Sequence, residues 1–421
     1  MLNKLWFVFN NKLSKDLSIY FLSQIFTALL PIVIIPVISR SLSIDEYGNY
    51  SLYKSIFGFI LPLIGLSFSN AVVRKYYSMS QSDYKSYILT LIFILFFSTL
   101  LFYLLIQFNL ELLLSLLKID NSLIIFYAIY VAFLTSISSI FLGYYRVTHA
   151  TGKFLVSNMV IVIITIIGVF LLEVQNELIL NNLLFVHLLA ILISIIYNAA
   201  DYLKNNRKFE LDFSNIKDTL LYCWPLIIYS ILAQIYAIGD RFIINYYLDK
   251  ESLAIYSAGL QMAFAIPILG KSIQLAWTPY VFENIKKGKE SKLKYISLYL
   301  TIALIVFSIL YIIIYPFIFN FFLPNIYNAA LEFFILFIVA GFFQSSYWLF
   351  SPFLLYYERN VIFIYITLLA AIISVALNFL IVEYGLIWVA TVFMLSWIIQ
   401  FIALLLSIKY VTSFKKIKQE N

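Results

Sequence analysis

Charged residues and cysteine are scarce in this sequence of 421 residues. Only 12% of the residues are Asp, Glu, Lys or Arg, about half the share in a soluble globular domain, and Cys223 is the one cysteine. A single cysteine in an apolar segment excludes a disulfide framework and a cysteine-based metal site. The low charge leaves too little polar surface to solvate a globular protein of this length.

The sequence also lacks the motifs that mark nucleotide-driven or hydrolytic proteins. Neither G-x-x-x-x-G-K-[ST] nor G-x-S-x-G occurs, and no group of His, Asp and Glu has metal-ligand spacing. The two histidines, His149 and His187, are interpreted as structural. We therefore expect a protein that is not an enzyme and that binds no cofactor. If it moves a solute, a proton or sodium gradient or the membrane potential would have to supply the energy.

What the sequence has instead is apolar surface. Hydrophobic residues make up 63% of the chain and aromatic residues 19%. A membrane span needs about 20 apolar residues, and the gaps between charged residues leave room for twelve. The ninth gap is longer and is interpreted as one helix followed by an aromatic hairpin around Pro316 and Pro324. The twelve gaps are 17–39, 55–73, 86–110, 121–145, 154–172, 178–200, 219–239, 252–270, 295–331, 333–357, 360–382 and 384–408.

The distribution of lysine and arginine predicts the orientation of these spans. With the N-terminus inside, 22 of the 28 basic residues fall in the inside segments and four fall in outside loops. Because basic residues favour cytoplasmic loops, we expect both termini in the cytoplasm. The net charge of +7 is then a signal of orientation and of contact with lipid headgroups, and it does not indicate nucleic acid.

A polar stretch after six spans divides the chain into two halves. The expected parts are a cytoplasmic segment 1–16, an N-lobe 17–200 with six spans, a cytoplasmic linker 201–219, a C-lobe 220–408 with six spans, and a basic cytoplasmic tail 409–421. At an offset of 206 residues, 38–51 aligns with 244–257, with Tyr50 over Tyr256 and Ser51 over Ser257. An even number of spans per repeat predicts two pseudo-symmetric, parallel lobes. This is a transporter plan, with a substrate site near the membrane midplane between the lobes.

Several polar residues lie within the predicted spans, where a charge is costly and by default faces a cavity or a partner. Lys271 is the clearest, because an eighth span drawn from Leu253 to Phe282 places it near the middle. Mostly cationic side chains on the first two helices of each half would attract an anion such as pyrophosphate. The alternative is that each cation pairs with a nearby acid and only holds helices together. The candidate substrate-binding residues are Lys271, Lys54, Arg241, Arg40, Asp240, Gln274, Gln234 and Gln24.

Short motifs resemble the polysaccharide-biosynthesis flippases, the Wzx-type transporters of O-antigen and capsule repeat units. The first span contains Pro36, and its turn carries Tyr47-Gly48. The second span continues through Gly65-Leu66 to Asn70 and Arg74, as in that family. In the second half, the family-like stretches are Gly239-Asp240-Arg241-Phe-Ile-Ile, Ile255-Tyr256-Ser257-Ala258 and Phe322-Leu323-Pro324 with Tyr327-Asn-Ala-Ala.

The resemblance implies an all-α membrane protein of about twelve helices in two MATE-like lobes. It implies alternating access that carries an undecaprenyl-pyrophosphate-linked oligosaccharide from the cytoplasmic to the outer leaflet of the inner membrane. The implied partners are this glycan lipid, membrane lipids and other membrane proteins of polysaccharide assembly. A cationic central cavity would neutralise the pyrophosphate.

Two other functions compete with this reading. A MATE-like exporter of small cationic drugs would need acidic residues deep in the cavity, and Asp240 is the one candidate. An O-antigen polymerase or ligase would need a large outward loop that carries catalytic residues. The predicted outward loops are short, which disfavours this enzyme class.

Overall fold

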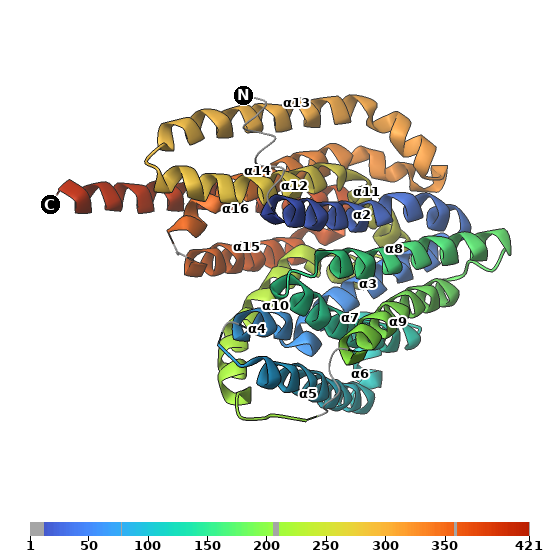
Figure 1. Ribbon diagram of the computed structural model, residues 1–421. Coiled ribbons are helices and arrows are strands. Elements are labelled where there is room, and N and C mark those ends of the chain that lie inside the picture. The colour runs from blue at the N-terminus through green and yellow to red at the C-terminus, as the bar shows by residue number, and fades with distance from the viewer. Residues whose placement is uncertain (1–11, 77, 205–209, 358–359, 421) are drawn as a thin grey trace. The chain divides into compact units, whose positions relative to one another are not determined.

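The protein is described by a computed structural model over residues 12–76, 78–204, 210–357 and 360–420. Every regular element within those residues is a helix (Figure 1). The elements are α2 (Lys12–Ser41), α3 (Ile44–Gly65), α4 (Phe68–Lys75), α5 (Gln81–Phe108), α6 (Leu110–Leu117), α7 (Leu123–Val147), α8 (Thr151–Val174), α9 (Leu180–Lys204), α10 (Ile216–Tyr247), α11 (Lys250–Ala263), α12 (Ala265–Lys286), α13 (Glu290–Phe322), the 3₁₀ helix η1 (Asn325–Glu332), α14 (Phe334–Tyr356), α15 (Asn360–Ile381), the 3₁₀ helix η2 (Val382–Tyr384) and α16 (Leu386–Glu420).

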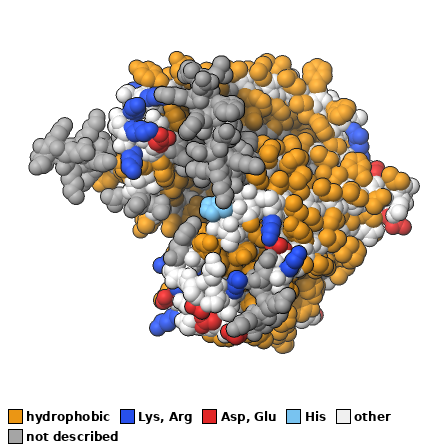
Figure 2. All heavy atoms as spheres, viewed as in Figure 1, with side chains coloured by type: hydrophobic (Ala, Val, Ile, Leu, Met, Phe, Trp, Pro, Cys, Tyr) orange, Lys and Arg blue, Asp and Glu red, His pale blue; other side chains and the backbone are white. Residues whose placement is uncertain are grey.

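The helices have the length and composition of membrane spans. In the described residues, ten are long and apolar enough to cross a bilayer, and a bent pair, Lys250–Ala263 with Ala265–Leu275, can form an eleventh. A further apolar stretch, Ile25–Ser41, lies within α2. Large apolar side chains such as Phe108 and Phe317 are exposed, and Figure 2 shows hydrophobic side chains over much of the visible surface. The chain is therefore a multi-pass membrane protein, and the predicted count of twelve is compatible with these helices.

The chain divides into two compact units, residues up to Ile231 and residues from Leu232. In the first unit, α3 packs on α7, α2 packs on α8, and α9 contacts both α7 and α8. Buried side chains of α4, α5 and α7 form its core, and Cys223 and Ile227 from the first half of α10 join it. The unit boundary thus lies inside α10, because the first half of that helix packs with the N-terminal core. The assignment of lobes around the linker 201–219 stays a prediction.

The second unit is organised around α14. This helix packs against α12, α13 and α16, and α15 packs on α16. Its buried faces hold aromatic side chains such as Tyr347 of α14 and Trp397 of α16, whose ring centroids lie 6.2 Å apart. A second cluster joins Trp277 of α12 to Leu349 of α14. This packing fixes α12, the helix that carries Lys271, against the centre of the unit.

The eighth predicted span, drawn from Leu253 to Phe282, is broken in the structure. It consists of α11 and α12, which meet at Phe264 with a bend of 42°. Pro267 explains the break, because its ring has no N–H to donate and clashes with the carbonyl of Ala263 four residues earlier. In membranes, such freed backbone groups are tolerated where they face protein or a water-filled cavity. The bend therefore marks this region as a place to look for a site.

Of the hairpin expected around Pro316 and Pro324, the structure has the turn at Pro324 and no turn at Pro316. The helix α13 continues through Pro316 to Phe322, and the chain turns only at Leu323 and Pro324, before η1. Proline is tolerated inside a membrane helix because neighbouring groups and local adjustments satisfy the backbone that it disrupts. The long ninth gap therefore holds most of the helix α13, which has 33 residues and begins before the gap, and most of the 3₁₀ helix η1.

The aligned hairpins of the two halves begin their second helices in the same way. Ser43 caps α3, and its hydroxyl accepts from the backbone N–H of Glu46 in a capping box. Asp249, which stands 206 residues later, caps α11 and accepts from the N–H of Ser252 at 2.6 Å. Such caps satisfy helix N–H groups that would otherwise lack partners. Both hairpins therefore turn at the same position of the proposed repeat.

Candidate functional site

Lys271 belongs to a group of hydrogen-bonded polar side chains between α12 and α14. The bend at Phe264 starts α12 two turns before it, and its side chain is exposed. Its Nζ donates to Oε1 of Gln274 at 2.8 Å, and Nε2 of Gln274 donates to Oγ of Ser351 at 2.9 Å. The Nζ also stands 5.2 Å from the ring centroid of Trp348. These contacts orient the ammonium group without neutralising it, so its charge remains available to an anion.

The glycine before this lysine allows α12 to approach α14 closely. A Cβ on Gly270 would lie 2.3 Å from Oγ and 2.7 Å from Cα of Ser345. The Cα belongs to the backbone, so a side-chain rotation cannot relieve the contact. The Ser345 hydroxyl also donates to the carbonyl of Ile266 at 3.1 Å, across the same helix contact. Gly270 therefore sets the position from which Lys271 extends.

Replacing Gly270 with alanine is expected to lower stability by about 1–3 kcal/mol, the usual cost of forcing extra atoms into a packed contact. The measurement is thermal unfolding of the detergent-purified protein. Gly152→Ala is the matched control, because a Cβ at that helical position meets nothing within 4 Å and alanine favours helix. Equal melting temperatures for Gly270→Ala and the unaltered protein would contradict the close contact.

A buried acid–base pair occupies α10 in the same unit. Asp240 is 4% exposed, and its Oδ1 lies 3.6 Å from Nη1 of Arg241. The same Nη1 donates to the carbonyl of Ala237 at 2.9 Å, and the hydroxyl of Tyr256 donates to Oδ2 of Asp240. Both carboxylate oxygens are thus satisfied by groups from α10 and α11. Asp240 pairs with Arg241, as expected if this cation is held by a nearby acid.

Arg241 also lines a small cavity of about 130 Å³ in the C-terminal unit. The cavity is bounded by Phe264 at the bend, Pro267, Trp397 and the amide of Gln344. Its walls are mainly aromatic and apolar, and one cation and one amide give it polar character. The helix break thus brings the arginine and the start of α12 to the same cavity.

The remaining candidates lie elsewhere in the fold. Lys54 is exposed on α3, with its Nζ 5.8 Å from the ring centroid of Tyr50. Arg40 is exposed in the last turn of α2, and Gln234 is half-buried on α10. The side chain of Gln24 lies outside the described residues. Their roles in binding stay predictions.

Sequence reasoning missed four residues of this site. Ser351 and Trp348 are on α14, far from Lys271 in sequence, so no local pattern connects them to it. Gly270 gave no signal beyond its position next to a lysine. Tyr256 did give a sequence signal, because it aligns with Tyr50 in the repeat. Its hydrogen bond to Asp240, however, follows only from the contact of α11 with α10.

The sequence matches known proteins along most of its length. A family model described as polysaccharide biosynthesis protein matches residues 13–285. Lsg locus protein 1 of Haemophilus influenzae is 23% identical over 380 residues, which cover 87% of this chain and 90% of that protein. An uncharacterized membrane protein of the same organism is 27% identical over 304 residues, which cover 70% and 71%.

The fold matches solved transporter structures. The inward closed conformation of the lipid II flippase MurJ superposes with a TM-score of 0.74 at 16% identity, covering 93% of this chain and 86% of that one. An inward-facing multidrug resistance MATE transporter of the MOP superfamily superposes with a TM-score of 0.69 at 12% identity, covering 92% and 96%. The predicted all-helical, MATE-like fold is confirmed.

Proposed function

Because this chain belongs to the polysaccharide biosynthesis protein family, we propose that it is a flippase of lipid-linked glycans. Its substrate would be an undecaprenyl-pyrophosphate-linked repeat unit of O-antigen or capsule. The protein would carry it by alternating access from the cytoplasmic to the outer leaflet of the inner membrane. The structural likeness to a lipid II flippase supports this class of substrate.

The observation that carries the proposal is the cation on the broken span. Lys271 is exposed, and its described polar contact is with the neutral Gln274. A pyrophosphate that crosses apolar depth needs such a charge, because an unpaired ion in a membrane is strongly disfavoured. Arg241 lies on the cavity beside the same bend and would offer a planar fork to phosphate oxygens. These positive charges would repel a small cationic drug, which argues against a MATE-like drug exporter.

The charge of the substrate also suggests a source of energy. Each negative charge that moves outward across an inside-negative potential gains about 2.3 kcal/mol per 100 mV. We propose that the membrane potential contributes to net outward movement. Transport could also be coupled to a flow of protons or sodium ions, and a measurement of transport in membrane vesicles would detect this coupling.

Disruption of the gene in its native host tests the function. We expect loss of the surface polysaccharide and accumulation of lipid-linked repeat units in the cytoplasmic leaflet. Complementation with the intact gene should restore both. Collapse of the potential or of the ion gradients in membrane vesicles, one at a time, would then identify the driving force.

Two outcomes of this experiment would reject the flippase. Single repeat units that still reach the surface while polymer length changes would identify a polymerase. Normal polysaccharide together with raised sensitivity to cationic drugs would identify an exporter.

A further inference from the structure

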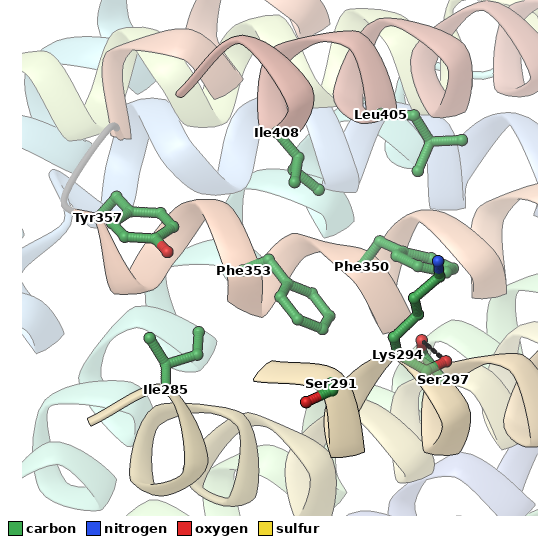
Figure 3. Close-up of a pocket in the computed structure, with 9 residues that line it drawn as sticks. All are labelled: Ile285, Ser291, Lys294, Ser297, Phe350, Phe353, Tyr357, Leu405 and Ile408. Atoms are coloured by element: carbon green, nitrogen blue, oxygen red, sulfur yellow. Dashed lines mark hydrogen bonds between the residues drawn. The ribbon is translucent and has the colours of Figure 1, made fainter. Parts of the chain in front are cut away.

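A second cavity lies in the C-terminal unit, apart from Lys271 and Arg241. Its volume is about 410 Å³, within the range of ligand pockets in proteins. Figure 3 shows it between the end of α12, the first turns of α13, the end of α14 and the middle of α16. The lining residues are Ile285, Ser291, Lys294, Ser297, Phe350, Phe353, Tyr357, Leu405 and Ile408.

The lining of this cavity is amphipathic. Phe350 and Phe353 of α14 and Leu405 of α16 form apolar walls. Lys294 of α13 extends toward Phe350, and the hydroxyl of Ser291 lies on the same helix, one turn earlier (Figure 3). A cation and a hydroxyl beside aromatic and aliphatic walls suit a ligand with an anionic head and an apolar chain.

Two neighbouring lysines, Lys287 and Lys292, contact other side chains. Lys287 donates to Glu283, and this hydrogen bond lowers the pKa of the Glu283 carboxyl. Lys292 places its Nζ 5.7 Å from the ring centroid of Tyr280. Among the side chains that the structure describes, no carboxylate forms an ion pair with Lys294. Lys294 belongs to the same basic segment, and its side chain lines the cavity.

The lining residues also lie beside segments that the charge pattern places in the cytoplasm. With the N-terminus inside, the loops between the eighth and ninth and between the tenth and eleventh predicted spans are cytoplasmic; the first covers 283–294, with Ser291 and Lys294, and the second covers 356–360, with Tyr357. Ile408 directly precedes the predicted tail 409–421. The cytoplasmic leaflet carries anionic lipids, whose surface potential attracts basic segments near the membrane. The expected depth of the cavity therefore matches that of an anionic headgroup.

We propose that this cavity binds an anionic glycerophospholipid of the cytoplasmic leaflet, with the phosphate at Lys294 and Ser291 and part of an acyl chain against α14 and α16. One lysine balances the single negative charge of a phosphodiester. A lipid pyrophosphate carries more negative charge than the one lysine that lines this cavity can neutralise. The lipid is therefore a bound component of the protein and is not its cargo.

The test is a titration of the purified full chain with dioctanoyl phosphatidylglycerol, followed by native mass spectrometry. We expect Lys294→Gln to weaken binding about tenfold, because one charge-assisted hydrogen bond is lost. Lys294→Arg should retain most of the affinity. Lys292→Gln is the matched control, two residues away on the same helix, and should change the affinity less than twofold.

Each other outcome overturns the proposal. An equal loss in Lys292→Gln and Lys294→Gln would indicate diffuse surface attraction instead of a site. Equal binding of zwitterionic phosphatidylethanolamine would remove the role of net charge, and competition by inorganic phosphate alone would indicate an anion site without a lipid. The readout is binding, so it does not depend on the transport function, and a failure of one proposal leaves the other standing.

Discussion

Replacing Lys271 with glutamine is expected to reduce transport of the lipid-linked oligosaccharide at least tenfold. Two unit charges 4 Å apart interact by about 4 kcal/mol at an effective dielectric constant of 20, and about 1.4 kcal/mol corresponds to a factor of ten. Glutamine retains a hydrogen-bond donor for Gln274 but carries no charge. The side chain is exposed, so the substitution should leave the fold intact. The measurement is recovery of surface polysaccharide in the disrupted strain, normalised to the amount of protein in the membrane.

Two further variants separate charge from general effects on α12. Lys271→Arg keeps the positive charge and should retain part of the activity, although its geometry differs from that of an ammonium. Lys286→Gln removes a charge from the exposed end of the same helix and should complement fully. Full complementation by normally expressed Lys271→Gln would remove this residue from substrate binding.

Much of the fold follows from composition, because hydrophobic length dictates membrane helices directly. The gaps between charges located the helices, and the fold class was confirmed by the MurJ and MATE structures. The sequence prediction and the structure differ at a proline, Pro316, because the effect of a proline on a helix depends on what surrounds it. Pro267 breaks its helix with a bend of 42°, whereas Pro316 lies within the continuous α13. Sequence alone cannot distinguish these cases, because tertiary neighbours decide whether the disrupted backbone is satisfied.

The site was predictable where its contacts are local. Lys271 and Gln274 are three residues apart, so helix geometry places them on one face, and the structure joins them by a hydrogen bond. The contacts of Gln274 with Ser351 and of Lys271 with Trp348 cross to α14, and the register of that contact depends on the fit of Gly270 against Ser345. Such a fit follows from packing in three dimensions, so no pattern within α12 predicts its partners.

The variant Asp240→Leu is expected to lower the stability of the C-terminal unit by about 3–5 kcal/mol. Removing one member of a buried ion pair leaves the other charge without compensation, and that cost exceeds the value of the pair. Arg241 would retain the carbonyl of Ala237, and the hydroxyl of Tyr256 would lose its carboxylate. The measurement is thermal unfolding of the purified protein. The control Tyr256→Phe removes only the hydroxyl and should cost about 1–3 kcal/mol, because the Asp240 oxygen loses that donor.

The double variant Asp240→Leu with Arg241→Met distinguishes a structural pair from a binding group. Replacing both members of a buried pair with apolar residues is often neutral or stabilising, so most of the lost stability should return. If Arg241 also binds phosphate at the cavity that it lines, transport should remain low although the protein is stable again. Recovery of both stability and transport would show that the pair only holds α10 in place. Continued instability of the double variant would mean that Asp240 supports the fold through Tyr256 more than through Arg241.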